Sequence, residues 1–125
     1  MKQLTRLYKI STNNLNLRKQ FLRFTAEDIR ILKRLAGWAE RVADAVAKEF
    51  YDHQFGFSET RTFFEDFARK KGISIEQLRQ GLERTQAEYF RQIFREADAG
   101  GDFGLGYFER RLVVGMVHNV IDLPL

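Results

Sequence analysis

Apolar residues along most of this chain recur every three or four positions, which is the period of an α-helix. Runs with this period predict helices over about 25–37, 38–54, 58–71, 75–97 and 107–121. Glycines or residues that favour helix starts separate the runs, and no stretch shows a convincing strand pattern. The pattern therefore predicts an all-α fold.

Two of these runs begin with residues that favour the start of a helix. Ser74 followed by Gln77 forms a capping box, in which each side chain can accept a hydrogen bond from the other residue's backbone N–H. Thr25 with Asp28 approximates the same motif. These two pairs predict where the helices after residues 25 and 74 begin.

Small residues accompany the run over 38–54. Trp38, Val42, Val46 and Phe50 follow one another at intervals of four, and positions 39, 43 and 47 beside them are alanines. Because alanine adds so little bulk to a helix surface, this line predicts that a neighbouring helix approaches closely.

Composition narrows the classes of function. The chain has 125 residues, enough for one domain at most, and contains 12 phenylalanines but no cysteine. The lack of cysteine excludes disulfides, thiolate zinc sites and iron–sulfur clusters. The 21 basic residues are interspersed with 17 acidic ones, so we expect a solvated surface and no nucleic-acid partner. No apolar segment approaches the ~20 residues of a membrane span, so we expect a cytoplasmic protein without a membrane partner.

One of the two histidines lies on the apolar side of the last predicted helix. Val114, Val117 and Ile121 flank His118 at helical spacing. A neutral imidazole there could ligate a metal in an apolar cavity, although a core histidine bonded to a backbone carbonyl is the commoner explanation of such spacing. We expect His53 at the surface. A zinc site with several ligands is not predicted, because the chain has no cysteine and a third ligand would have to be a carboxylate. Haem needs only one protein ligand and is compatible with the chain.

Several segments resemble motifs of the globin-coupled sensors and protoglobins. In chain order they are Glu49–His53, Leu82–Phe94, Tyr107–Arg111 and Val114–Pro124. The first is similar to a Phe-Tyr pair on the family's second globin helix, the second to its distal helix, and the last two to its proximal-histidine helix. The resemblance implies a globin-like helical fold.

The same resemblance implies a division of the chain. Residues 1–24, where the helical period is weak and residues 11–14 interrupt it, correspond to an N-terminal helical extension. Residues 25–125 correspond to a partial globin sensor domain that lacks the family's final two helices. Asp122 also departs from the glycine common in the family. Because the missing helices would leave an apolar face uncovered, we expect a homo-oligomer, with exchange of helices between chains as one route.

The resemblance also implies a site for haem b. It assigns His118 as the iron ligand and Tyr51 as a hydrogen-bond donor to bound oxygen or another diatomic gas; the alternative for Tyr51 is a core tyrosine bonded to a carbonyl. Thr85 and Gln86 are two further donors between which the sequence does not choose. The candidate apolar walls of the haem pocket are Phe50, Phe64, Leu82, Tyr89 and Val114.

The function that the resemblance implies is gas sensing, with the signal passed to an output domain absent from this chain. A haem-free globin-like module for signalling or oligomerisation is the alternative. We do not expect an enzyme, because no nucleophile–base pair or paired carboxylates appear and only Tyr51 could support acid–base chemistry.

Overall fold

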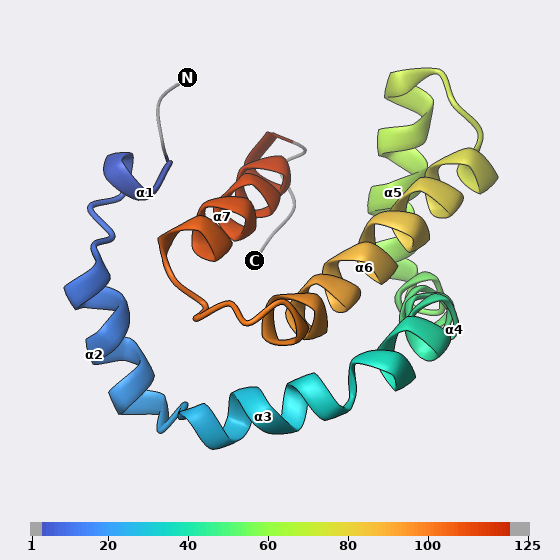
Figure 1. Cartoon of the computed structure of the whole chain (residues 1–125). Coiled ribbons are helices and arrows are strands. Elements are labelled where there is room, and N and C mark those ends of the chain that lie inside the picture. The colour runs from blue at the N-terminus through green and yellow to red at the C-terminus, as the bar shows by residue number, and fades with distance from the viewer. Residues whose placement is uncertain (1–3, 121–125) are drawn as a thin grey trace. The chain divides into compact units, whose positions relative to one another are not determined.

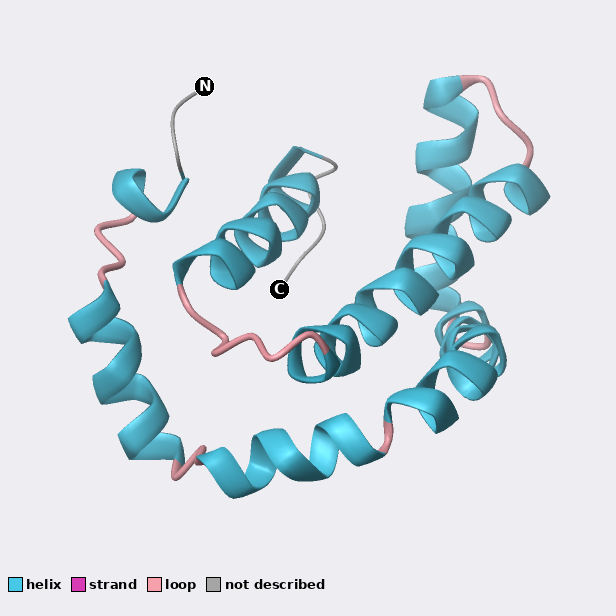
Figure 2. Ribbon diagram, viewed as in Figure 1, coloured by secondary structure: helices cyan, strands magenta, loops and turns pink. Residues whose placement is uncertain are grey.

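The computed structural model describes the backbone of residues 4–120 and the side chains of residues 4–114. Every regular element in that part of the chain is a helix (Figure 2). The helices are α1 (Leu4–Leu7), α2 (Thr12–Leu22), α3 (Ala26–Arg34), α4 (Ala36–Phe55), α5 (Ser58–Lys71), α6 (Ile75–Asp98) and α7 (Leu105–Val120) (Figure 1). The predicted all-α fold is confirmed.

Local hydrogen bonds form at the helix starts that the sequence predicted. Ser74 and Gln77 form the reciprocal capping box, with N–H to side-chain oxygen distances of 3.0 and 3.1 Å. The Thr25 N–H donates to Asp28 Oδ2 at 2.8 Å, which gives one half of the motif before α3. Residues 11–14 were predicted to interrupt the N-terminal arm, but α2 begins at Thr12, and the Ser11 hydroxyl caps it by accepting from the Asn14 N–H. The interruption therefore lies earlier than predicted, over residues 8–11 between α1 and α2.

One predicted boundary is wrong. The run over 25–37 was expected to end at Gly37, but α3 ends at Arg34 and Gly37 lies in the first turn of α4. The break falls at Leu35, whose φ of −92° and ψ of 1° depart from the helix. Because Leu35 is apolar and continues the helical period, the pattern of apolar residues did not reveal the break.

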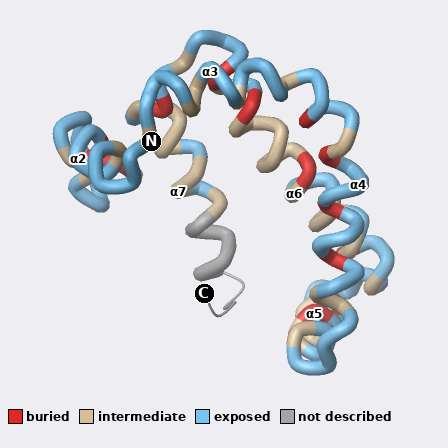
Figure 3. Tube along the Cα trace, turned by 90° about the horizontal axis from the view of Figure 1, so that it is seen from below, coloured by how far each residue is buried: buried red, intermediate tan, exposed pale blue. Residues whose placement is uncertain are grey.

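The chain divides into two compact units, Leu35–Phe94 and the combination of Met1–Arg34 with Arg95–Leu125. In the Leu35–Phe94 unit, the buried residues of α4 recur every fourth position (red in Figure 3). They are Ala39, Ala43, Ala47 and Tyr51. Ala43 and Ala47 cluster with Ala87 of α6, which confirms the predicted close approach of a helix along the alanine line. The larger apolar side chains beside the alanine line, which begin at Trp38, remain partly exposed to solvent: Trp38 itself is 43% exposed.

The other unit is held together by contacts between chain segments far apart in the sequence. Leu15 of α2 is buried, and the Phe24 and Phe103 rings meet edge to face at 5.2 Å. Lys19 Nζ donates to the Asp102 carbonyl oxygen at 2.6 Å. The ring contact and this hydrogen bond connect Phe24 and α2 to the loop before α7. Among the helices that the structure describes, none is long and apolar enough to cross a membrane.

Candidate functional site

Tyr51 lies in a cluster of aromatic and aliphatic side chains within the Leu35–Phe94 unit. It is 8% exposed, and the buried members of the cluster are Tyr51 of α4, Phe64 and Ala68 of α5, and Leu78 of α6. Partly buried residues pack around them: Phe55, Phe63, Phe67, Ile75 and Leu82. The i, i+4 spacing that buries the alanine line also places Tyr51 on the inner face of α4.

Aromatic rings surround the Tyr51 ring on several sides. Its centroid lies 5.0 Å from that of Phe50, and 6.4 Å from those of Phe55 and Phe64, all in edge-to-face geometry. Phe55 and Phe64 are themselves stacked at 5.1 Å. Edge-to-face packing limits how far a ring can turn without losing contacts. The neighbours of Tyr51 therefore favour one orientation of its ring.

The Tyr51 phenol remains neutral over the physiological range. Burial raises its pKa above the usual value near 10.0, and the negative charge of Glu83 raises the pKa further. A neutral phenol keeps its O–H as a hydrogen-bond donor. A protonated donor in an apolar, aromatic environment is the chemistry that Tyr51 can supply.

The two alternative donors on α6 occupy different environments. Thr85 is exposed, and its hydroxyl donates to the Gly81 carbonyl oxygen at 2.9 Å within the same helix. Gln86 is half-buried. The hydroxyl proton of Thr85 is therefore already engaged.

The structure brings together some of the residues that the sequence singled out. Phe50, Phe64 and Leu82 all lie around Tyr51, although Phe50 is 44% exposed. Tyr89 is half-buried on α6 and lies outside this cluster.

The two remaining candidates belong to α7, in the other unit. Val114 is half-buried. His118 falls within the backbone span of α7, and its side chain lies outside the described residues.

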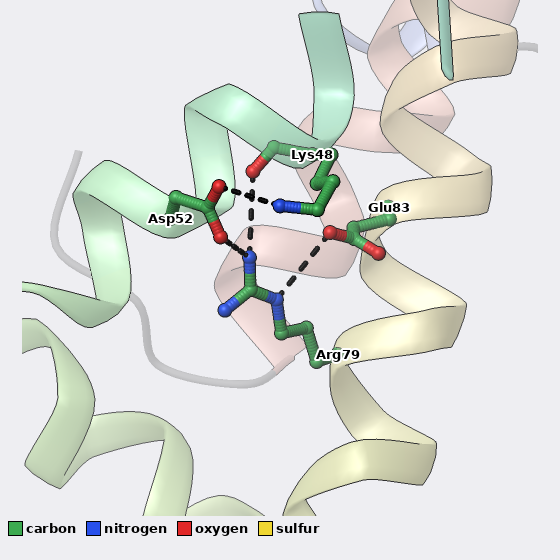
Figure 4. Close-up of polar contacts among 4 residues, drawn as sticks. All are labelled: Lys48, Asp52, Arg79 and Glu83. Carbon is green, nitrogen blue, oxygen red and sulfur yellow. Dashed lines mark hydrogen bonds and ion pairs between the residues drawn. The ribbon is translucent and has the colours of Figure 1, made fainter. Parts of the chain in front are cut away.

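A cluster of charged residues beside Tyr51 was not among the sequence candidates. It consists of Lys48, Asp52, Arg79 and Glu83 (Figure 4). Arg79 pairs with Asp52, its Nε donates to Glu83 Oε1 at 3.3 Å, and its Nη2 donates to the Lys48 carbonyl oxygen at 3.4 Å. Lys48 Nζ donates to Asp52 Oδ2 at 2.9 Å. We call these four residues the Arg79 cluster.

The sequence carries a partial signal for the Arg79 cluster. Lys48 and Asp52 are spaced i, i+4 on one helix, and Arg79 and Glu83 have the same spacing on another. Such pairs are common on solvated helix faces and indicate no site by themselves. Only the packing of α4 against α6 joins the two pairs.

The residues around Tyr51 fit one side of a haem by their chemistry. Flat aromatic and aliphatic side chains suit an apolar macrocycle, and a single buried phenol supplies a donor for a polar ligand. Two cations lie over rings at the edge of this cluster: the Arg79 guanidinium over Phe55 and the Lys71 ammonium over Phe67.

Comparison with known proteins identifies the family. The family model described as Protoglobin matches residues 11–125. Among curated proteins, the heme-based aerotactic transducer HemAT of Halobacterium salinarum is 31% identical over 84 residues, which are 67% of this chain and 14% of that protein. The match therefore spans a small part of the relative's length. No solved structure matches the chain. Because the family model covers nearly the whole sequence, this chain belongs to the protoglobin family.

Proposed function

We propose that this chain is a haem-binding sensor domain that binds oxygen or another diatomic gas and passes the signal to an output domain or partner. The observation that carries the proposal is the buried Tyr51 phenol, enclosed by aromatic rings in a chain of the protoglobin family. The relative from Halobacterium salinarum is named as a heme-based transducer, which supports a sensory role and signal input rather than catalysis.

The proposal gives each candidate residue a task. His118 would hold the iron through an imidazole nitrogen, and bound haem b would supply the metal at which a diatomic gas binds. Tyr51 donates a hydrogen bond toward the gas. Gln86 is the second donor; Thr85 could take that role only by giving up its bond to the Gly81 carbonyl oxygen. The residues that would line the macrocycle and exclude water are Phe50, Phe64, Leu82, Tyr89 and Val114.

A phenol donor also selects among gases. Oxygen becomes polarised on binding and gains from a hydrogen bond, whereas carbon monoxide gains less. The raised pKa of Tyr51 keeps its donor proton in place at neutral pH. We therefore propose oxygen as the ligand that this domain senses.

The test of haem binding is the absorption spectrum of the purified chain after incubation with haem. We expect a Soret band for the wild type and for His53→Ala, and its loss in His118→Ala. His53 is an exposed histidine on α4 and serves as the matched control. A band that survives in His118→Ala contradicts the assignment of the iron ligand. A wild type that shows no band at all would favour the haem-free signalling module.

We also propose that the domain forms a homo-oligomer. Helix α2 exposes large apolar side chains in the unit to which it belongs, with Leu17 at 56%, Phe21 at 87% and Leu22 at 72%. A second copy of the chain could cover them, and burying them would favour association. Size-exclusion chromatography with light scattering should give a mass above 14.7 kDa. A monomer at that mass contradicts the proposal.

A further inference from the structure

Arg79 is connected to Tyr51 indirectly, in two separate ways. The first connection is an ion pair between Arg79 and Asp52, the residue that follows Tyr51 on α4. The second connection is a series of ring contacts. The Arg79 guanidinium lies over the Phe55 ring at 5.2 Å from its centroid, and Phe55 meets the Tyr51 ring edge to face.

The side chain of Arg79 is well held. It is 28% exposed, and its guanidinium engages Asp52 and Glu83 while one face covers Phe55. A planar guanidinium can make these contacts at once, whereas a lysine ammonium cannot. Arg79 therefore links α4 and α6 at the level of Tyr51 through charge, hydrogen bonding and ring contact.

Arg79 also holds the carboxylate whose charge acts on Tyr51. Glu83 is half-buried, and its negative charge raises the pKa of Tyr51. A carboxylate without a cationic partner is a strong hydrogen-bond acceptor and competes for nearby donors. Arg79 supplies that cationic partner, because its Nε lies 3.3 Å from Glu83 Oε1.

We propose that Arg79 is a positioning residue for Tyr51: it fixes the Tyr51 ring through Asp52 and Phe55 and keeps Glu83 engaged, so that the phenol proton is available to a ligand. The ligand part of this inference rests on the proposed function. The positioning of the ring belongs to the protein itself and can be measured without haem.

Arg91 offers a matched control on the same helix. It also joins α6 to α4, with Nε 3.1 Å from Glu40 Oε2 and Nη2 3.2 Å from Asp44 Oδ2. Its side chain is 18% exposed, against 28% for that of Arg79. Neither Glu40 nor Asp44 adjoins Tyr51 in the chain. Removing Arg91 therefore loosens a similar link between α4 and α6 away from Tyr51.

The experiment compares Arg79→Gln with Arg91→Gln in the full chain. The first measurement uses haem-free protein labelled with ¹³C-tyrosine, in which an aromatic correlation spectrum reports on the four tyrosines. Tyr51→Phe identifies the Tyr51 signal by its disappearance. We expect Arg79→Gln to shift or broaden that signal and Arg91→Gln to leave it unchanged. The second measurement is the oxygen dissociation rate of haem-loaded protein. It should rise about two- to tenfold in Arg79→Gln, as for a weakened hydrogen bond, and less than twofold in Arg91→Gln.

Two results would overturn the inference: a Tyr51 signal that Arg79→Gln leaves unchanged, or one that Arg91→Gln moves equally. If circular dichroism shows that Arg79→Gln does not fold, Arg79→Lys replaces it. Lysine keeps the charge and cannot hold both carboxylates, so a smaller displacement of the Tyr51 signal is expected, and no displacement contradicts the proposal. If the wild type shows no Soret band, the proposed function is refuted. The positioning of Tyr51 by Arg79 is not, because a moved Tyr51 signal in haem-free Arg79→Gln would still support it.

Discussion

Arg79 of α6 forms an ion pair with Asp52 of α4, the residue directly after Tyr51. Hydrogen bonds from Lys48 and then from Arg79 hold the pKa of the Asp52 carboxyl below its usual value. An isolated ion pair on a protein surface contributes little to stability. This one is tied to a second carboxylate and to an aromatic ring, so its effect is to fix local geometry around Tyr51.

Removing the Tyr51 hydroxyl should weaken oxygen binding selectively. In Tyr51→Phe the aromatic packing remains and the donor is lost, so we expect oxygen to dissociate about tenfold faster, equivalent to ~1.4 kcal/mol. Carbon monoxide dissociation should change little. Flash photolysis or stopped-flow mixing of haem-loaded protein measures both rates. Tyr8→Phe, at a half-exposed tyrosine, is the control. Equal effects on both gases would show that Tyr51 acts through packing alone.

The alanine line of α4 should tolerate no added bulk. Ala43 is fully buried against Ala47 and Ala87, so Ala43→Leu should lower the free energy of unfolding by about 1–3 kcal/mol through overpacking. Ala45 is exposed on the same helix, and Ala45→Leu should change stability by less than about 0.5 kcal/mol. Urea denaturation followed by circular dichroism measures both. Similar values for the two variants would mean that α6 does not pack closely on this face.

Two glycines should respond to alanine with opposite signs. Gly72 ends α5 at a φ of +70°, where a Cβ is unfavourable, so Gly72→Ala should cost about 1 kcal/mol of stability. Gly81 lies within α6, and a Cβ there meets no atom within 4 Å. Gly81→Ala should therefore stabilise the protein by about 0.5–1 kcal/mol. Thermal unfolding of the two variants gives the signs, and a stabilising Gly72→Ala would contradict the left-handed geometry.

The contact between Glu109 and α1 should depend on pH. Glu109 accepts a hydrogen bond from the Thr5 N–H at 2.7 Å and another from the Leu4 N–H. These bonds, Thr5's first, hold the pKa of Glu109 below its ordinary value of 4.5. Because the folded-state pKa is depressed, the stabilisation is present above about pH 4.5 and is lost as the pH falls through the folded value.

Hydrogen exchange at the Leu4 and Thr5 amides checks this dependence. In the wild type, the protection factors should be higher at pH 7 than at a pH well below 4.5. In Glu109→Gln they should be low at both, because the charge-assisted acceptor is gone. Protection in the variant equal to that of the wild type at pH 7 would show that the carboxylate does not hold α1.

Local features of the fold could be predicted from the sequence because their causes lie within a few residues. The helical period predicted α4, α5 and α6 nearly to their ends, and the capping box at Ser74 and Gln77 needs no partner outside its own turn. The break at Leu35 escaped prediction, since an apolar residue there continues the same period.

Part of the candidate site could be predicted in the same way. A family motif pointed to Tyr51, and the structure shows that Tyr51 shares the buried face of α4 with the alanines. The assignments of Tyr51 and His118 to a haem remain proposals. Arg79 was missed, because an arginine followed four residues later by a glutamate is ordinary on a helix surface.

The amino-acid sequence by itself determined the helices, their capping and the family to which the chain belongs, since these depend on residue order and short-range spacing. Tertiary structure decided which stripe of α4 is buried: the alanine line, and not the larger side chains that begin at Trp38. It also decided that Asp52 and Arg79 meet. Both outcomes depend on how closely α6 approaches α4, and that distance follows from the packing of side chains from two helices rather than from the period of either one.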